Sequence, residues 1–118
     1  MTHSEELKKE IRDNIHKWER EPDSDLQLPG AVVRYRPKEN YLSIDYLTRF
    51  GVLEFPIDLK PDESDSESTV ADGMEVEIRD GYSIGYNRDQ DVLHIRYDKF
   101  GFMIPLQTIR RRWEMLRS

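Results

Sequence analysis

The sequence predicts an α+β fold in which two tandem antiparallel β-meander repeats form one sheet, a sandwich or a small barrel. An N-terminal and a C-terminal amphipathic helix flank the repeats. Three observations support this prediction: a segment of alternating apolar residues occurs twice, and an apolar stripe with helical spacing lies near each end of the chain. Because 118 residues are the length of one ordinary domain, we expect a single domain over residues 1–118.

The N-terminal helix is expected over residues 4–21. Its apolar residues recur at helical spacing and form one stripe: Leu7, Ile11, Ile15 and Trp18. Thr2 and Glu5 have the spacing of a capping box, in which two side chains bond free backbone N–H groups of the first turn. Pro22 follows the stripe and indicates the end of the helix.

A repeated pattern predicts a first β repeat over residues 26–57 and a second over residues 74–105. In both copies apolar and polar residues alternate, which is typical of strands with one buried face and one solvated face. At a constant offset the matching pairs are Gly30 and Gly81, Tyr35 and Tyr86, Leu42 and Leu93, Ile44 and Ile95, and Tyr46 and Tyr97. Each copy is expected to form a three-stranded meander after a short leading strand.

The turns of the two repeats also match. Phe50-Gly51 corresponds to Phe100-Gly101, and Pro56 corresponds to Pro105. Proline cannot donate a hydrogen bond to a ladder, so both prolines mark the end of a strand or the edge of a sheet. The shared turn placement favours a structural duplication over a chance likeness of two β-rich segments.

An acidic, flexible linker is expected over residues 61–73, between the two repeats. It is rich in Ser, Asp and Glu and too poor in apolar groups to offset the entropy lost on ordering. Joining the two repeats is one role for it. The alternative is an acidic tether that engages a basic partner through Asp62, Glu63, Asp65 and Glu67.

The C-terminal helix is expected over residues 106–117, directly after Pro105. One face carries apolar residues, which predicts packing against the sheet: Leu106, Ile109, Trp113 and Leu116. The arginines of this helix, together with Trp113, also offer a contact for nucleic acid or another partner, because arginines bind phosphates and tryptophan stacks on bases. These candidate contacts are Arg110, Arg111, Arg112, Trp113 and Arg117.

Composition narrows the classes of protein to consider. The chain has a net charge of −6, which disfavours general binding to nucleic-acid backbones. It has no cysteine, which excludes disulfides and zinc–thiolate sites. No apolar run approaches the ~18 residues of a membrane span, and no secretory signal is visible at the N-terminus. We expect a soluble, cytoplasmic protein that does not bind membranes.

No catalytic residue, metal site or cofactor is predicted. His3, His16 and His94 lack a second ligand at the spacing of a metal site. Ser43 aligns with His94 between the two repeats, but no oriented base or oxyanion hole accompanies the pair. No glycine-rich phosphate loop occurs. We therefore expect that the protein is not an enzyme.

The segment "IGYNRDQDVLHIRYDKFGFMIPLQTI" resembles small β-β-β-α modules such as those of the KTSC family. The shared pattern is a tyrosine, a polar turn, a Leu-x-Ile-x-Tyr strand, a glycine, a proline and a helix. The resemblance covers less than a third of the chain and implies a fold only, since no functional residue is carried over.

These patterns favour a small, non-catalytic protein-interaction or regulatory module, such as an inhibitor or adaptor that binds another protein. A homodimer joined by an exposed strand edge or a helix stripe is one form that it could take. The alternative function is a nucleic-acid-associated regulator that uses the arginine-rich C-terminal helix.

Overall fold

The computed structural model describes residues 3–59, 75–79, 81–97 and 99–117. The predicted linker over 61–73 lies outside the described residues, as do its acidic side chains Asp62, Glu63, Asp65 and Glu67. In the C-terminal helix, the side chains of Arg112, Trp113, Leu116 and Arg117 also lie outside them.

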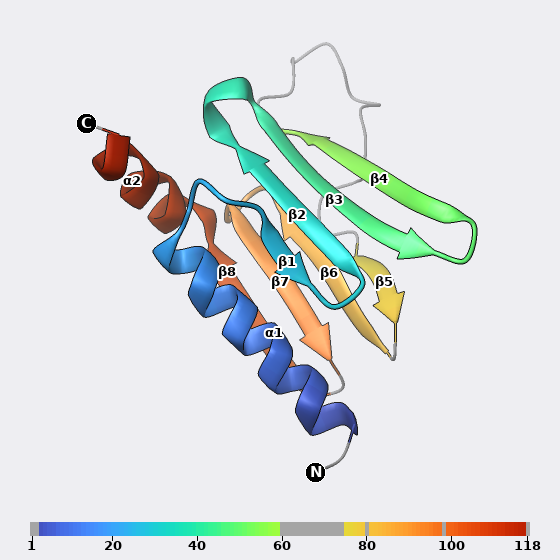
Figure 1. Cartoon of the computed structure of the whole chain (residues 1–118). Coiled ribbons are helices and arrows are strands. Elements are labelled where there is room, and N and C mark those ends of the chain that lie inside the picture. The colour runs from blue at the N-terminus through green and yellow to red at the C-terminus, as the bar shows by residue number, and fades with distance from the viewer. Residues whose placement is uncertain (1–2, 60–74, 80, 98, 118) are drawn as a thin grey trace.

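Two helices and two antiparallel sheets make up the described chain (Figure 1). Helix α1 spans His3–Arg20, and helix α2 spans Leu106–Arg117. The first sheet contains β1 (Leu26–Leu28), β2 (Ala31–Arg36), β3 (Tyr41–Thr48) and β4 (Gly51–Asp58), with a 3-10 turn at Pro37–Glu39 between β2 and β3. The second sheet contains β5 (Glu75–Arg79), β6 (Tyr82–Asn87), β7 (Val92–Tyr97) and β8 (Phe100–Pro105).

The predicted α+β class and the antiparallel pairing are confirmed. Each sheet has four strands in sequential order, so the short leading strand of each repeat pairs with the meander that follows it. The alternatives of one continuous sheet and of a closed barrel are wrong, because the strands divide into two separate sheets. The N-terminal helix is present and begins one residue earlier than expected.

The β2–β3 and β6–β7 pairings of the two sheets correspond. Tyr35 pairs with Leu42 in the first sheet, as Tyr86 pairs with Leu93 in the second. Gly30 and Gly81 turn the chain between the first two strands of each sheet with φ angles of 83° and 80°, a region that glycine enters without steric cost. Asn40 and Asp91 also share a left-handed backbone, with φ angles of 56° and 53°.

The last hairpin of each sheet differs. Thr48 pairs with Gly51, so Phe50 lies in the β3–β4 turn, whereas Tyr97 pairs with Phe100, the first residue of β8. Pro56 pairs with Ser43 and Pro105 with Val92, so the predicted matches of Phe50-Gly51 with Phe100-Gly101 and of Pro56 with Pro105 are wrong.

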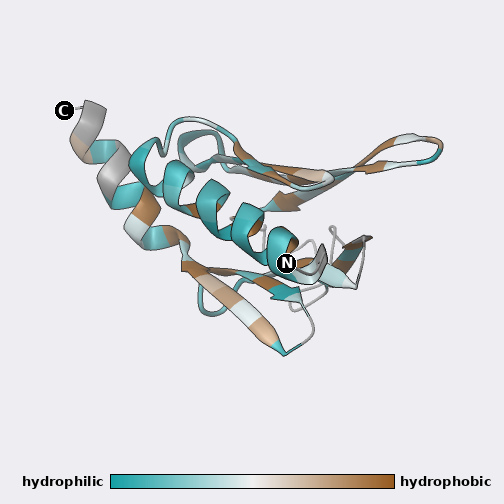
Figure 2. Ribbon diagram, turned by 60° about the horizontal axis from the view of Figure 1, so that its bottom comes forward, coloured by the Kyte–Doolittle hydropathy of each residue, from teal (hydrophilic) through white to brown (hydrophobic). Residues whose placement is uncertain are grey.

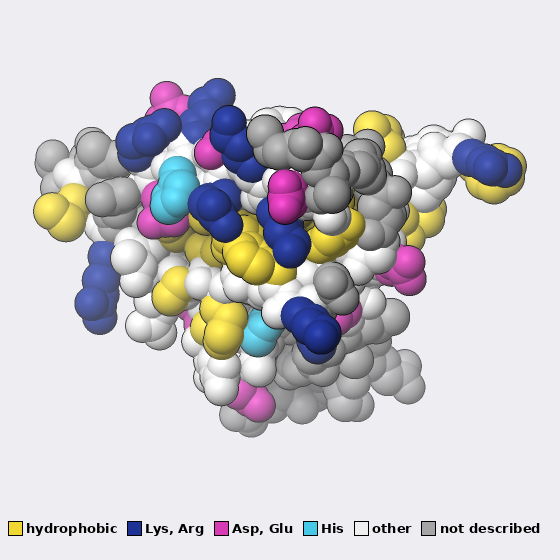
Figure 3. All heavy atoms as spheres, turned by 90° about the horizontal axis from the view of Figure 1, so that it is seen from below, with side chains coloured by type: hydrophobic (Ala, Val, Ile, Leu, Met, Phe, Trp, Pro, Cys, Tyr) yellow, Lys and Arg dark blue, Asp and Glu magenta, His cyan; other side chains and the backbone are white. Residues whose placement is uncertain are grey.

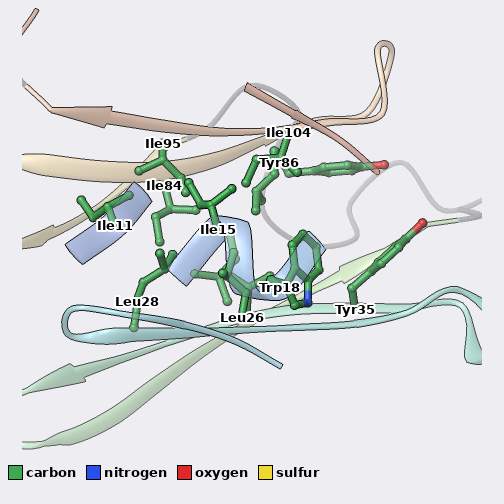
Figure 4. Close-up of a cluster of buried hydrophobic side chains, with 14 of the residues drawn as sticks. Ile11, Ile15, Trp18, Leu26, Leu28, Tyr35, Ile84, Tyr86, Ile95 and Ile104 are labelled. Atoms are coloured by element: carbon green, nitrogen blue, oxygen red, sulfur yellow. The ribbon is translucent and has the colours of Figure 1, made fainter. Parts of the chain in front are cut away.

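Helix α1 lies between the two sheets and contributes to a common core (Figure 2). Its predicted apolar stripe is buried, with Ile11 fully inaccessible to solvent. Figure 4 shows Ile11, Ile15 and Trp18 among side chains of both sheets, including Leu26 and Ile84. Since full burial of one such aliphatic side chain contributes ~1.5–3 kcal/mol, the stripe is a main source of stability for this packing.

The segment after α1 is held by Trp18. Its indole N–H donates to the backbone oxygen of Ser24 at 2.8 Å, and its ring packs edge-on against Tyr35 at 6.5 Å between centroids. The Ser24 hydroxyl donates in turn to the backbone oxygen of Glu21 at 2.6 Å. These bonds fix the chain between the helix and β1, so the tryptophan is structural.

Helix α2 begins against the core. Leu106 and Ile109 are buried, and the Leu106 N–H donates to the backbone oxygen of Asp91 at 3.0 Å. Met115, near its end, is 76% exposed, and Figure 1 shows this end of α2 projecting away from the sheets. Leu106 and Ile109 of the predicted apolar face are therefore buried, while the side chains of Trp113 and Leu116 lie outside the described residues.

Candidate functional site

The largest group of exposed apolar side chains in the described part of the chain lies on the β3–β4 hairpin. Leu47 is 66% exposed, Phe50 97%, Val52 62% and Leu53 47%. Figures 1 and 2 show the turn between β3 and β4 projecting past the rest of the chain. In Figure 3 the same end, at the far right, carries hydrophobic and basic side chains. We call Leu47, Phe50, Val52 and Leu53 the hairpin patch.

The turn of the hairpin is ordered by Thr48. Its hydroxyl accepts a hydrogen bond from the Phe50 N–H at 3.1 Å and donates to the backbone oxygen of Gly51 at 3.0 Å. Gly51 has a φ angle of 133°, which side-chain-bearing residues rarely adopt. The turn therefore holds Phe50 out into solvent in a defined position.

Both faces of the hairpin end are apolar. On the face shared with the buried Ile44, Tyr46 stacks on Phe55 at 5.5 Å between centroids, and Leu53 pairs directly with Tyr46. On the opposite face Leu47 pairs with Val52. A solvated edge strand normally shows one polar face, so this arrangement is typical of a surface that is covered by something else.

Among the described strands, β4 pairs only with β3, so its other edge carries backbone groups that no described strand bonds. The Leu47 N–H donates to the backbone oxygen of Gly30, in the turn before β2, at 3.0 Å. It therefore points toward β2 and away from β4, so Leu47 and its β4 partner Val52 do not bond each other. Bonded and non-bonded pairs alternate along an antiparallel ladder, and Pro56, which has no N–H, falls on a non-bonded pair as expected. The N–H and C=O groups of Val52 and Glu54 therefore point away from β3.

A polar network covers the neighbouring face of the first sheet. Asp45 accepts a hydrogen bond from the buried Ser43 hydroxyl at 2.5 Å, and Arg34 Nε lies 3.6 Å from Asp45 Oδ2. Arg34 and Arg36 both reach Asp25, at 3.7 and 2.5 Å. Both carboxylates of the network, Asp25 and Asp45, are therefore paired with arginines of the same sheet, which indicates a structural role.

Ser43 and His94 are not brought together. Their chain neighbours Leu42, Ile44, Leu93 and Ile95 all face the shared core, and side chains alternate between the faces of a strand. The two side chains therefore point away from each other on separate sheets. In the described residues no group of three or more His, Asp or Glu side chains is placed to hold a metal ion.

Two buried tyrosines at matching positions of the sheets occupy one end of the core (Figure 4). The Tyr86 hydroxyl donates to Asp91 Oδ1 at 2.9 Å. Burial raises the pKa of Tyr86 above its ordinary value of 10.0, and the Asp91 carboxylate adds to the rise. Burial also raises the pKa of Tyr35, against the opposing effect of the Arg110 guanidinium. Both phenols are therefore held neutral, which is a structural role.

The predicted arginine contact is only partly described. Arg110 is half-buried beside Tyr35, whereas Arg111 is exposed. The side chains of Arg112, Trp113 and Arg117 lie outside the described residues. Arg110 is thus partly committed to the core, and the described residues do not assemble a basic surface around Arg111.

A second apolar surface lies between α1, β8 and the start of α2. It is a groove of roughly 300 Å³ whose lining residues include Arg12, Ile15, Phe102, Ile104 and Ile109. Arg12 and Lys8 lie over the Phe100 ring, at 5.5 and 5.0 Å from its centroid. These contacts show that α1 runs along β8, the edge strand of the second sheet.

Sequence reasoning missed the hairpin patch, although a signal was present. Apolar residues stand next to each other at Tyr46-Leu47 and Val52-Leu53. Adjacent residues of a strand point to opposite faces, so these pairs indicate a hairpin end that is apolar on both sides.

No protein-family model matches the chain, and no curated protein or solved structure matches it significantly. The resemblance of the second repeat to the KTSC family therefore gains no support. Among the described residues, no helix is both long enough and apolar enough to cross a membrane.

Proposed function

We propose that this chain is a non-catalytic protein-interaction module whose contact surface is the β3–β4 hairpin. The observation that carries the proposal is the combination of the hairpin patch with the free backbone groups of Val52 and Glu54 on the same edge strand. Apolar side chains supply binding energy, and an open strand edge supplies directional hydrogen bonds.

Comparison of the two sheets strengthens this proposal. If the sheets are duplicated halves packed as a sandwich, β4 and β8 are corresponding edge strands. Helix α1 runs along β8, as its contacts with Phe100 show, whereas neither helix of the described residues lies beside β4 (Figure 1). An open edge with apolar side chains is a site for pairing with another chain unless something protects it. The protein partner supplies on β4 the cover that α1 supplies on β8.

The experiment is affinity capture from the native source with three immobilised proteins: wild type, Leu53→Asp and Met103→Asp. Met103 is 60% exposed on β8 and receives the same change in charge, so it serves as the matched control. We expect a binding protein that is retained by wild type and Met103→Asp and lost from Leu53→Asp. Capture that is unaffected by Leu53→Asp would contradict the assignment of the surface.

A further inference from the structure

We propose that the β4 edge binds β4 of a second copy of this chain, with a two-fold axis at Leu53. This inference rests on the proposed function and names the partner of the same surface. The two first sheets then join into one continuous antiparallel sheet across the axis. Two-fold dimers are self-complementary, so every contact made by β4 must be satisfied by β4 itself.

The backbone selects this register. Val52 and Glu54 carry the free N–H and C=O groups, and antiparallel pairing with the axis at Leu53 sets Val52 of one copy against Glu54 of the other. Each of these residues then donates and accepts a hydrogen bond. Pro56 has no N–H to donate, which limits useful pairing to Gly51–Phe55, and Leu53 is the centre of that stretch.

The side chains support the same register over its neighbours. With the axis at Leu53, the two Leu53 side chains meet directly, and Phe50 of one copy lies beside the exposed Pro56 of the other. A shift that places the axis at Glu54 would set two carboxylates directly opposite each other, which is destabilising. A shift that places the axis at Val52 would set Glu54 of one copy opposite Phe50 in the turn of the other copy, where no strand continues to bond the free backbone groups of Glu54.

The size of the surface indicates the strength of the dimer. A standard interface buries about 800 Å² on each partner, and one hairpin edge lies at or below that figure. Phe50, which is 97% exposed, is the largest apolar side chain available to it. We therefore expect a weak dimer, with a dissociation constant in the micromolar range, and not an obligate one.

The absence of cysteine makes disulfide trapping a direct test. At the axis, Leu53 occupies a non-bonded antiparallel pair, where Cα atoms lie about 4.5 Å apart, within the range that a disulfide spans. Leu53→Cys should therefore form a covalent dimer under mild oxidation. Leu47→Cys is the matched control, since Leu47 is exposed on the same hairpin but sits one strand further in. Its Cα would lie roughly 16 Å from its copy, three strand spacings across and two residues along the sheet, too far for a disulfide.

Sedimentation equilibrium of the unmodified chain provides the second measurement. We expect a concentration-dependent dimer, with a dissociation constant raised at least tenfold by Leu53→Asp and unchanged by Met103→Asp. Cross-linking of Leu53→Cys that is no faster than that of Leu47→Cys would overturn the register. A wild-type chain that stays monomeric up to millimolar concentration would overturn the dimer. Monomeric protein that still captures a different protein through Leu53 overturns this inference and leaves the proposed function standing.

Discussion

Replacement of Ile11 by alanine should destabilise both sheets together. Ile11 is fully buried in the core that α1 shares with them. The change removes about three methylene equivalents, worth ~0.8 kcal/mol each, and leaves a cavity, so we expect a loss of ~3 kcal/mol within a range of ~2–5. At ~2.1 cal/mol/K of unfolding entropy per residue, this corresponds to a fall in Tm of about 12 °C.

Urea denaturation followed by circular dichroism measures this loss. Ile11→Val should cost ~0.5–1.5 kcal/mol, and Asp13→Ala, at an exposed position of the same helix, should change the free energy of unfolding by less than ~0.5 kcal/mol. The denaturant slope m should remain that of wild type, because the core unfolds as one unit. A loss below ~1 kcal/mol for Ile11→Ala, or a slope that falls as one sheet unfolds alone, would refute the placement of α1 between the sheets.

Three further outcomes are expected. The folded-state pKa of Tyr86 is raised above 10.0, so its contribution to stability is complete below about pH 10 and is lost as the pH rises above that value. Urea titrations at increasing pH should therefore show a smaller decline in the free energy of unfolding for Tyr86→Phe than for wild type. Phe50→Ser should leave the free energy of unfolding within ~0.5 kcal/mol of wild type, because Phe50 is 97% exposed, while it weakens self-association in sedimentation. Fluorescence anisotropy at low salt should show no binding to short single- or double-stranded DNA or RNA, given the net charge of −6; salt-dependent micromolar binding that is lost when Arg110, Arg111 and Arg112 become alanine would favour the nucleic-acid function instead.

The secondary structure could be predicted from local patterns. The stripe ending at Trp18 predicts α1, and the alternation at Leu42 and Ile44 predicts β3, because each period fixes which face is buried. Proline cannot donate to a ladder, so it predicts a strand end or a sheet edge: Pro105 is the last residue of β8, and Pro56 lies within the edge strand β4. These features depend only on neighbours in the chain.

The arrangement of these elements could not be derived in the same way. Alternation shows that Ile44 and Ile95 are buried but does not show what covers them, so a single sheet, a barrel and separate sheets around a helix all remain compatible with it. The burial of Ser43 also depends on tertiary contacts, because it requires Asp45 beside it and Arg34 on the adjacent strand. Exposure of the hairpin patch likewise depends on how far the second sheet extends.

Amide hydrogen exchange along β4 tests the central claim most directly. In dilute protein, Val52 and Glu54 should exchange rapidly because their N–H groups point to the open edge, while Leu53 and Phe55, paired with Tyr46 and Ile44, exchange slowly. As the protein concentration rises or a partner is added, Val52 and Glu54 should become protected and the exchange of Leu53 and Phe55 should change little. Rapid exchange of Val52 and Glu54 under every condition would contradict the use of the β4 edge as a binding surface.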